Sequence, residues 1–171
     1  MDSLGTMTLP GYRFAAHTVR MCRITSHDND AREERTGWGF LIATNPPFEE
    51  PPVAEGECGA FEGVALYADD EPVPLPALTD FTGLDFFLKE SHRPDGAVYF
   101  TFDPAEAHDV SDVRIQFIER EGSRYRVDLS AIVYNVLRTG PAEVRYSGWI
   151  NVTEGRVFDA EQNAPADRPR D

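Results

Sequence analysis

The sequence lacks any long apolar run, and its 171 residues include only two cysteines and a single lysine. No stretch approaches the ~20 apolar residues that a membrane-spanning helix requires. Residues 1–10 also lack the basic start and the apolar stretch of a signal peptide. Cys22 and Cys58 do not have the close spacing of a zinc or redox motif. We therefore expect a cytoplasmic protein with reduced thiols and no membrane association.

The motifs of several large enzyme classes are missing as well. The chain contains no GxGxxG, GxxxxGK[ST], GxSxG or HExxH sequence, which argues against the common nucleotide-binding, hydrolase and zinc-protease classes. An enzyme whose site is assembled from distant strands stays open. The formal net charge of −14 opposes binding to nucleic acid, because such binding needs a cationic face. The same charge favours a cationic partner.

A helical pattern is also lacking, whereas alternation with a period of two is clear in the last third of the chain. Apolar and polar residues alternate over residues 113–117, 125–133 and 144–152, with turn residues at Gly122 and Gly140 between these segments. This period indicates strands that are buried on one face. Because the turns are short, we expect the three strands to be antiparallel neighbours.

Weaker strand patterns precede this region. The candidate segments are residues 12–24, 38–42, 61–67, 84–88 and 97–102, of which 84–88 also fits a helical turn. We predict an all-β, mainly antiparallel fold, either a β-sandwich or a partly open barrel. It should have about seven to nine strands and at most short helical turns. The expected organisation is a loose N-terminus (1–10), a single β domain (11–159) and a disordered tail (160–171).

Negative charge is concentrated in one part of the chain. Residues 44–88 contain no lysine or arginine, and their acidic residues are Glu49, Glu50, Glu55, Glu57, Glu62, Asp69, Asp70, Glu71, Asp80 and Asp85. The same region holds Pro46, Pro47, Pro51 and Pro52 in one connection and Pro72, Pro74 and Pro76 in another. Proline stiffens a segment and removes a hydrogen-bond donor. Such loops either present an anionic surface to a partner or are an ordinary solvated surface.

These features favour a non-enzymatic binding module that meets a basic protein through the 44–88 region. Trp149 falls on the polar phase of its strand, where it either covers a second sheet or anchors a partner. The predicted partner-binding residues are Glu49, Glu50, Glu55, Glu57, Asp69, Asp70, Glu71 and Trp149. No catalytic residue, metal ligand or cofactor is predicted, and the sequence does not define the oligomeric state.

Two alternatives stay open. One is a small-ligand-binding or enzymatic β-barrel, whose pocket would be lined by His17, Tyr99, Arg126 and Tyr134. The other is a calcium-dependent module of C2-like architecture. Its acidic loops would be Asp28-Asn29-Asp30, Asp69-Asp70-Glu71 and the group Asp103, Glu106, Asp109 and Asp112. His27 and His108 lie beside carboxylates in loops, and with the third loop histidine, His92, they could converge on a transition metal. None of them shows a known metal-ligand spacing.

Overall fold

The structure, a computed structural model, describes residues 4–28, 33–52, 61–93, 96–104, 106–137, 140–154 and 157. These residues form nine strands and no helix. The strands are β1 (Gly5–Leu9), β2 (Tyr12–Asp28), β3 (Glu33–Thr44), β4 (Ala65–Val73), β5 (Asp85–Glu90), β6 (Thr101–Asp103), β7 (Val110–Glu121), β8 (Arg124–Leu137) and β9 (Gly140–Thr153). The prediction of an all-β, mainly antiparallel fold is therefore confirmed. The described residues include no helix long and apolar enough to span a bilayer.

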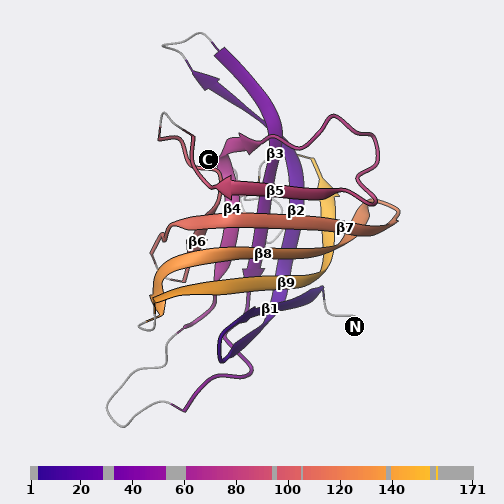
Figure 1. Ribbon diagram of the computed structural model, residues 1–171. Coiled ribbons are helices and arrows are strands. Elements are labelled where there is room, and N and C mark those ends of the chain that lie inside the picture. The colour runs from indigo at the N-terminus through magenta and orange to yellow at the C-terminus, as the bar shows by residue number, and fades with distance from the viewer. Residues whose placement is uncertain are drawn as a thin grey trace, which may run out of the picture.

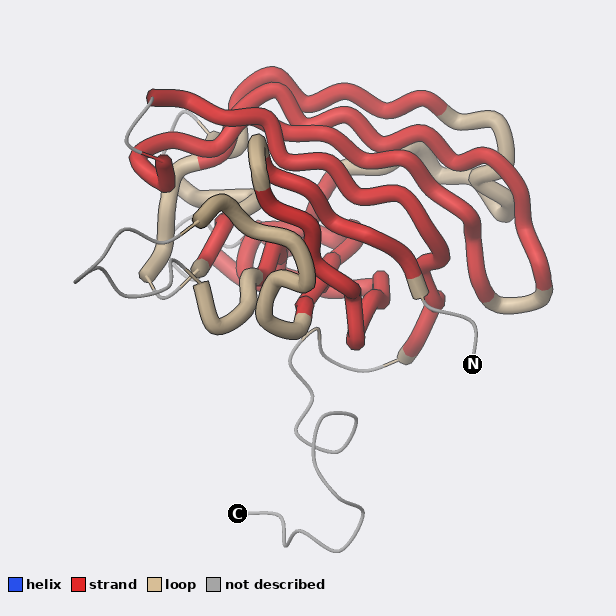
Figure 2. Tube along the Cα trace, turned by 90° about the horizontal axis from the view of Figure 1, so that it is seen from below, coloured by secondary structure: helices blue, strands red, loops and turns tan. Residues whose placement is uncertain are grey.

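All nine strands belong to one sheet, which curls into a half-barrel. The strand order is β5-β7-β8-β9-β1-β2-β3-β4-β6, and β2 and β9 also pair directly in parallel. In Figure 1, strands β5, β7, β8 and β9 run across strands β2, β3 and β4, which lie behind them. Figure 2 shows the resulting two layers from below. The chain thus encloses its core between two halves of the same sheet.

The apolar side chains of the alternating segments fill the space between the two layers. Ile115, Val127 and Val144 are at most 1% exposed, and their polar neighbours in sequence face outward. Phe81, in the connection between β4 and β5, contacts a ring of each layer: its centroid lies 5.4 Å from that of Trp38 on β3 and 5.2 Å from that of Phe117 on β7. Because apolar burial provides the main favourable free energy of folding, this alternation specifies which face of each strand points inward.

Strand β1 is the element that sequence reasoning missed. The prediction of a loose stretch over residues 1–10 is wrong for residues 5–9, which pair with β9 on one side and with β2 on the other. Met7 and Leu9 are 0% and 3% exposed. Only these two residues of β1 are buried, so the apolar–polar alternation is too short to identify a strand from the sequence. The predicted tail 160–171 lies outside the described residues.

Strand β4 differs from the prediction in another way. It continues through Asp69, Asp70 and Glu71 to Val73, where the sequence suggested a proline-rich connection. The register between β3 and β4 shifts between the pairs Trp38/Val73 and Phe40/Ala68. Because the ladder is interrupted at this bulge, Pro72 fits without the loss of a regular hydrogen bond.

Close packing of two glycines joins β1 to β9. Gly5 lies opposite Gly148, and the buried Tyr146 hydroxyl sits beside them, 3.1 Å from the Leu4 carbonyl oxygen and 2.7 Å from that of Trp149. A Cβ atom at position 148 would lie 2.5 Å from Gly5 Cα and 2.7 Å from this hydroxyl. No larger residue fits there without displacing β1.

We expect Gly148→Ala to lower the free energy of unfolding by about 2–3 kcal/mol, because the methyl group overlaps the β1 backbone. Urea denaturation measures this change. Ser147→Ala, which removes only an exposed hydrogen bond to Asp128, is the matched control and should change stability by less than about 0.5 kcal/mol. Equal stability of the two variants would contradict the close packing of β1 on β9.

Candidate functional site

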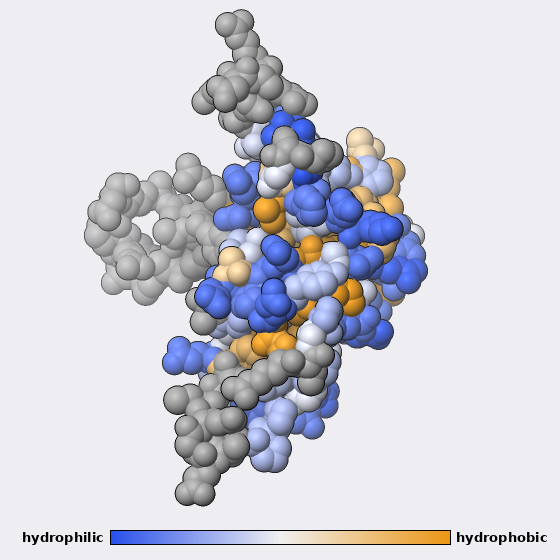
Figure 3. All heavy atoms as spheres, turned by 60° about the vertical axis from the view of Figure 1, so that its left-hand side comes forward, coloured by the Kyte–Doolittle hydropathy of each residue, from blue (hydrophilic) through white to orange (hydrophobic). Residues whose placement is uncertain are grey.

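The acidic region of the sequence acquires arginine partners in the folded chain. Arg13 lies 3.5 Å from Glu49, and Arg114 lies 2.6 Å from Asp85. All of these arginines come from outside residues 44–88, so the local excess of negative charge in the sequence is partly neutralised in space. Figure 3 shows a largely hydrophilic face with apolar side chains between the polar ones. A binding surface must therefore be sought among the carboxylates that stay exposed.

Glu71 is buried within such a group of charges. Its side chain is 4% exposed and accepts hydrogen bonds from Arg35 Nε at 2.7 Å, Arg35 Nη2 at 3.1 Å and Arg93 Nη1 at 3.1 Å. The carboxylate joins β4 to β3 and to the segment after β5. Because it is buried and held by two guanidinium groups, Glu71 is not part of the candidate surface.

The other predicted acidic residues divide into separate groups. Asp69 and Asp70 are exposed on β4, where partial burial, and then the neighbouring charge of Asp70, raise the pKa of Asp69. Glu49 and Glu50 are exposed beyond the end of β3. Glu55 and Glu57 lie outside the described residues.

The segment that carries Glu49 and Glu50 is fixed against the start of β2. The Arg13 amide donates to the Glu49 carbonyl oxygen, and the Phe48 amide donates to that of Arg13, both at 2.9 Å. Phe48 is 60% exposed, and the Arg13 guanidinium carbon lies 5.6 Å from its ring centroid. The backbone bonds and the cation–π contact hold an exposed aromatic ring in a defined place.

A second acidic segment approaches the same end of the sheet. The Thr44 amide donates to the Val64 carbonyl oxygen at 3.0 Å. Phe61 packs edge-on against Tyr12, with the centroids 4.9 Å apart. Glu62 follows Phe61 and is exposed. We name this surface, made of Phe48, Glu49, Glu50 and Glu62, the acidic end.

Trp149 does not belong to the acidic end. It is half-buried on the outer face of β9, and the Arg124 guanidinium carbon lies 4.1 Å from its ring centroid. Its amide donates to the Leu4 carbonyl oxygen at 2.7 Å, which places it at the start of β1. Arg13 is paired with Thr8 near the other end of β1, so most of this strand of five residues, about 16 Å long at 3.3 Å per residue, separates the two sites.

Those residues of the metal alternatives that the structure describes are not gathered into a binding site. Among the described residues, no three His, Cys, Asp or Glu side chains lie where they could hold one metal ion. His108 directs Nδ1 to the Tyr134 carbonyl oxygen at 3.1 Å, and His17 is exposed with Nδ1 2.8 Å from the Thr18 hydroxyl. His92 is also exposed. The side chains of His27 and Asp28, and all of residues 29–32, lie outside what the structure describes.

The residues of the predicted pocket are dispersed as well. Arg126 faces outward, 3.8 Å from Glu119, and the Tyr134 hydroxyl bonds to that of Ser111 at 2.7 Å. Both residues lie on β8, whereas the exposed His17 lies on β2 and the half-buried Tyr99 packs against the core. Cys22 is fully buried, and this burial raises the pKa of its thiol, which disfavours the thiolate that a nucleophile needs. Cys58 lies outside the described residues.

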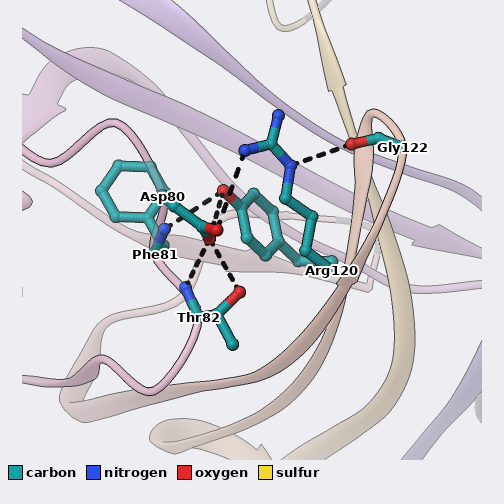
Figure 4. Close-up of polar contacts among 6 residues, drawn as sticks. Asp80, Phe81, Thr82, Arg120 and Gly122 are labelled. Carbon is teal, nitrogen blue, oxygen red and sulfur yellow. Dashed lines mark hydrogen bonds and ion pairs between the residues drawn. The ribbon is translucent and has the colours of Figure 1, made fainter.

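A polar cluster lies near the end of the connection between β4 and β5. Asp80 accepts hydrogen bonds from the Thr82 amide at 2.9 Å and the Thr82 hydroxyl at 2.7 Å, and Arg120 lies 4.0 Å away (Figure 4). The Phe81 amide donates to the Tyr125 hydroxyl at 3.1 Å. These contacts direct the Phe81 ring into the core, so the cluster is explained by the fold.

No model of a known protein family, no curated protein sequence and no solved structure matches this chain. The geometry and charge of the described residues are therefore what point to a function.

We expect Glu71→Gln to lower the free energy of unfolding by about 2–3 kcal/mol, because it removes a buried negative charge that two largely buried guanidinium groups share. Thermal or urea denaturation measures the loss. Asp70→Asn, one residue away but exposed, should change stability by less than about 0.5 kcal/mol. If the Glu71 variant were as stable as the wild type, the ion cluster would have no role in joining β3, β4 and residue 93.

The Asp80 carboxylate makes acid stability depend on this cluster. Hydrogen bonds from the Thr82 amide and hydroxyl hold the pKa of Asp80 below its usual value of 3.8. A carboxyl group with a lowered pKa in the folded state contributes stability above the usual value and loses it as pH falls through the folded value. We expect Asp80→Asn to be less stable at neutral pH and the difference to shrink below pH 3.8. Urea midpoints at each pH measure it; a constant difference would contradict the assignment.

Proposed function

We propose that this protein is a non-enzymatic binding module whose acidic end meets a basic protein surface. The observation that carries the proposal is the fixed exposure of Phe48 beside Glu49 and Glu50. Aromatic side chains that are exposed before binding are common anchors of protein interfaces. Because backbone hydrogen bonds to β2 already order this segment, binding costs little further conformational entropy.

Charge supports the choice of a basic partner. The acidic end contains Glu49, Glu50 and Glu62, with Arg13 as its neighbouring cation. The chain as a whole carries a formal net charge of −14, which steers cationic partners toward it and opposes nucleic acids. A cytoplasmic site of action is part of the same proposal, supported by the low cysteine content and the buried Cys22 thiol.

The proposal predicts that the acidic end, rather than net charge, determines partner binding. The test variant carries Glu49→Lys, Glu50→Lys and Glu62→Lys. The control variant carries Glu119→Lys, Glu121→Lys and Glu143→Lys, which make the same change in net charge on strands β7 and β9. Phe48→Ala and its control Ile118→Ala, another exposed apolar residue, separate the aromatic anchor from charge.

The wild type and each variant are immobilised, and proteins are captured on them from a native lysate at low ionic strength. The Kd of each captured protein is then measured by calorimetry with the wild type and with each variant. We expect basic proteins that bind the wild type and both controls, but bind the acidic-end variant and Phe48→Ala at least about tenfold more weakly. Equal binding to the test and control variants, or a retained set that is not basic, would contradict the proposal.

A further inference from the structure

Strand β5 ends the sheet and leaves one backbone edge open. It pairs with β7 through residues 85–90, and it is the terminal strand on its side of the sheet, at the top of the front layer in Figure 1. Within the described parts of the chain, no other segment forms backbone hydrogen bonds with the opposite edge of β5. Open edges of this kind are templates for pairing with another strand.

The side chains of β5 are arranged symmetrically about Phe87. Phe87 is 56% exposed on the outer face, with Asp85 two residues before it and Lys89, the single lysine of the chain, two residues after it. Lys89 forms no ion pair with a residue that the structure describes. On the inner face, Phe86 and Leu88 are half-buried and pack at the margin of the core.

This symmetry makes β5 complementary to itself. In an antiparallel pair of β5 strands centred on Phe87, each Phe87 faces its copy, and Asp85 of each strand faces Lys89 of the other. The Asp85 carboxylate already accepts two hydrogen bonds from Arg114 of its own chain, so Lys89 would be its second cationic partner. On the inner face, Phe86 faces Leu88. Directly opposed aromatic pairs and opposite charges stabilise antiparallel strands. A two-fold axis perpendicular to the sheet keeps both cores on the same side, so the two sheets become continuous.

We propose that two copies of this chain associate through β5 into a symmetric dimer with one continuous sheet. The local charge permits this despite the net charge of the chain. Strands β5, β7, β8 and β9 are nearly balanced in charge. They carry the six cations Lys89, Arg114, Arg120, Arg124, Arg126 and Arg145 and the seven carboxylates Asp85, Glu90, Asp112, Glu119, Glu121, Asp128 and Glu143. Two such edges therefore approach with little net repulsion. An interface of six residues per strand is smaller than that of permanent dimers, so the association is weak and depends on concentration.

Sedimentation velocity of the full-length protein, from about 1 μM to about 500 μM, tests the dimer. We expect a concentration-dependent shift from monomer to dimer for the wild type. Lys89→Glu places Glu opposite Asp85, and Asp85→Lys places Lys opposite Lys89, so each variant alone should raise the dimer Kd at least about tenfold. Arg126→Glu, which makes the same charge change as Lys89→Glu in the same layer but away from β5, should leave the Kd unchanged.

An equimolar mixture of the two variants tests most directly whether residues 85 and 89 face each other across the dimer. In the mixed pair, both contacts again join opposite charges, so an equimolar mixture of Lys89→Glu and Asp85→Lys chains should dimerise as the wild type does. Recovery in the mixture also shows that each variant is folded. A wild type that stays monomeric, variants that dimerise as strongly as the wild type, or a mixture that stays monomeric would each overturn the proposal. Because the acidic end is not part of β5, partner capture can fail without affecting this result.

Discussion

Strand β1, together with the direct pairing of β2 and β9, joins the two layers of the half-barrel, because it is hydrogen bonded to β9 along one edge and to β2 along the other. The pairing brings the last strand of the chain beside the first ones and turns nine strands into two facing layers. Gly5 and Gly148 permit the approach, and the buried Tyr146 hydroxyl satisfies carbonyl groups at the same point. The core, the position of Arg13 and the location of the open sheet edge all depend on this closure.

The closure also determines where negative charge is exposed. Arg13 follows the β1–β2 turn, and from there it contacts Phe48 and Glu49. The acidic end is thus a product of tertiary structure. Elsewhere, Glu71 and Asp85 are neutralised by arginines on other strands. The protein therefore combines a highly negative net charge with a defined surface, the acidic end, at which exposed carboxylates lie beside the exposed ring of Phe48.

Much of the fold could be predicted from the sequence, because strands buried on one face record their orientation in alternate residues. The pattern over residues 113–152 gave β7, β8 and β9 with the correct inward faces. The candidate site was less predictable. Glu49 and Glu71 lie 36 residues from Arg13 and Arg35 in the sequence, and no local pattern indicates such pairs. Composition therefore identified an acidic region but could not distinguish the buried Glu71 from the exposed Glu50. Trp149 was placed correctly on the polar phase of its strand, yet only the structure shows that Arg124 covers it and that β1 separates it from the acidic end.

The closure by β1 is tested most directly by amide hydrogen–deuterium exchange of the wild-type protein at neutral pH. If β1 holds the half-barrel closed, the amides of Met7 to Leu9 exchange as slowly as those of the central strand β8, and the Arg13 and Phe48 amides are protected with them. Rapid exchange at these positions, together with slow exchange in β8, would show that the sheet folds without β1 and would contradict the account.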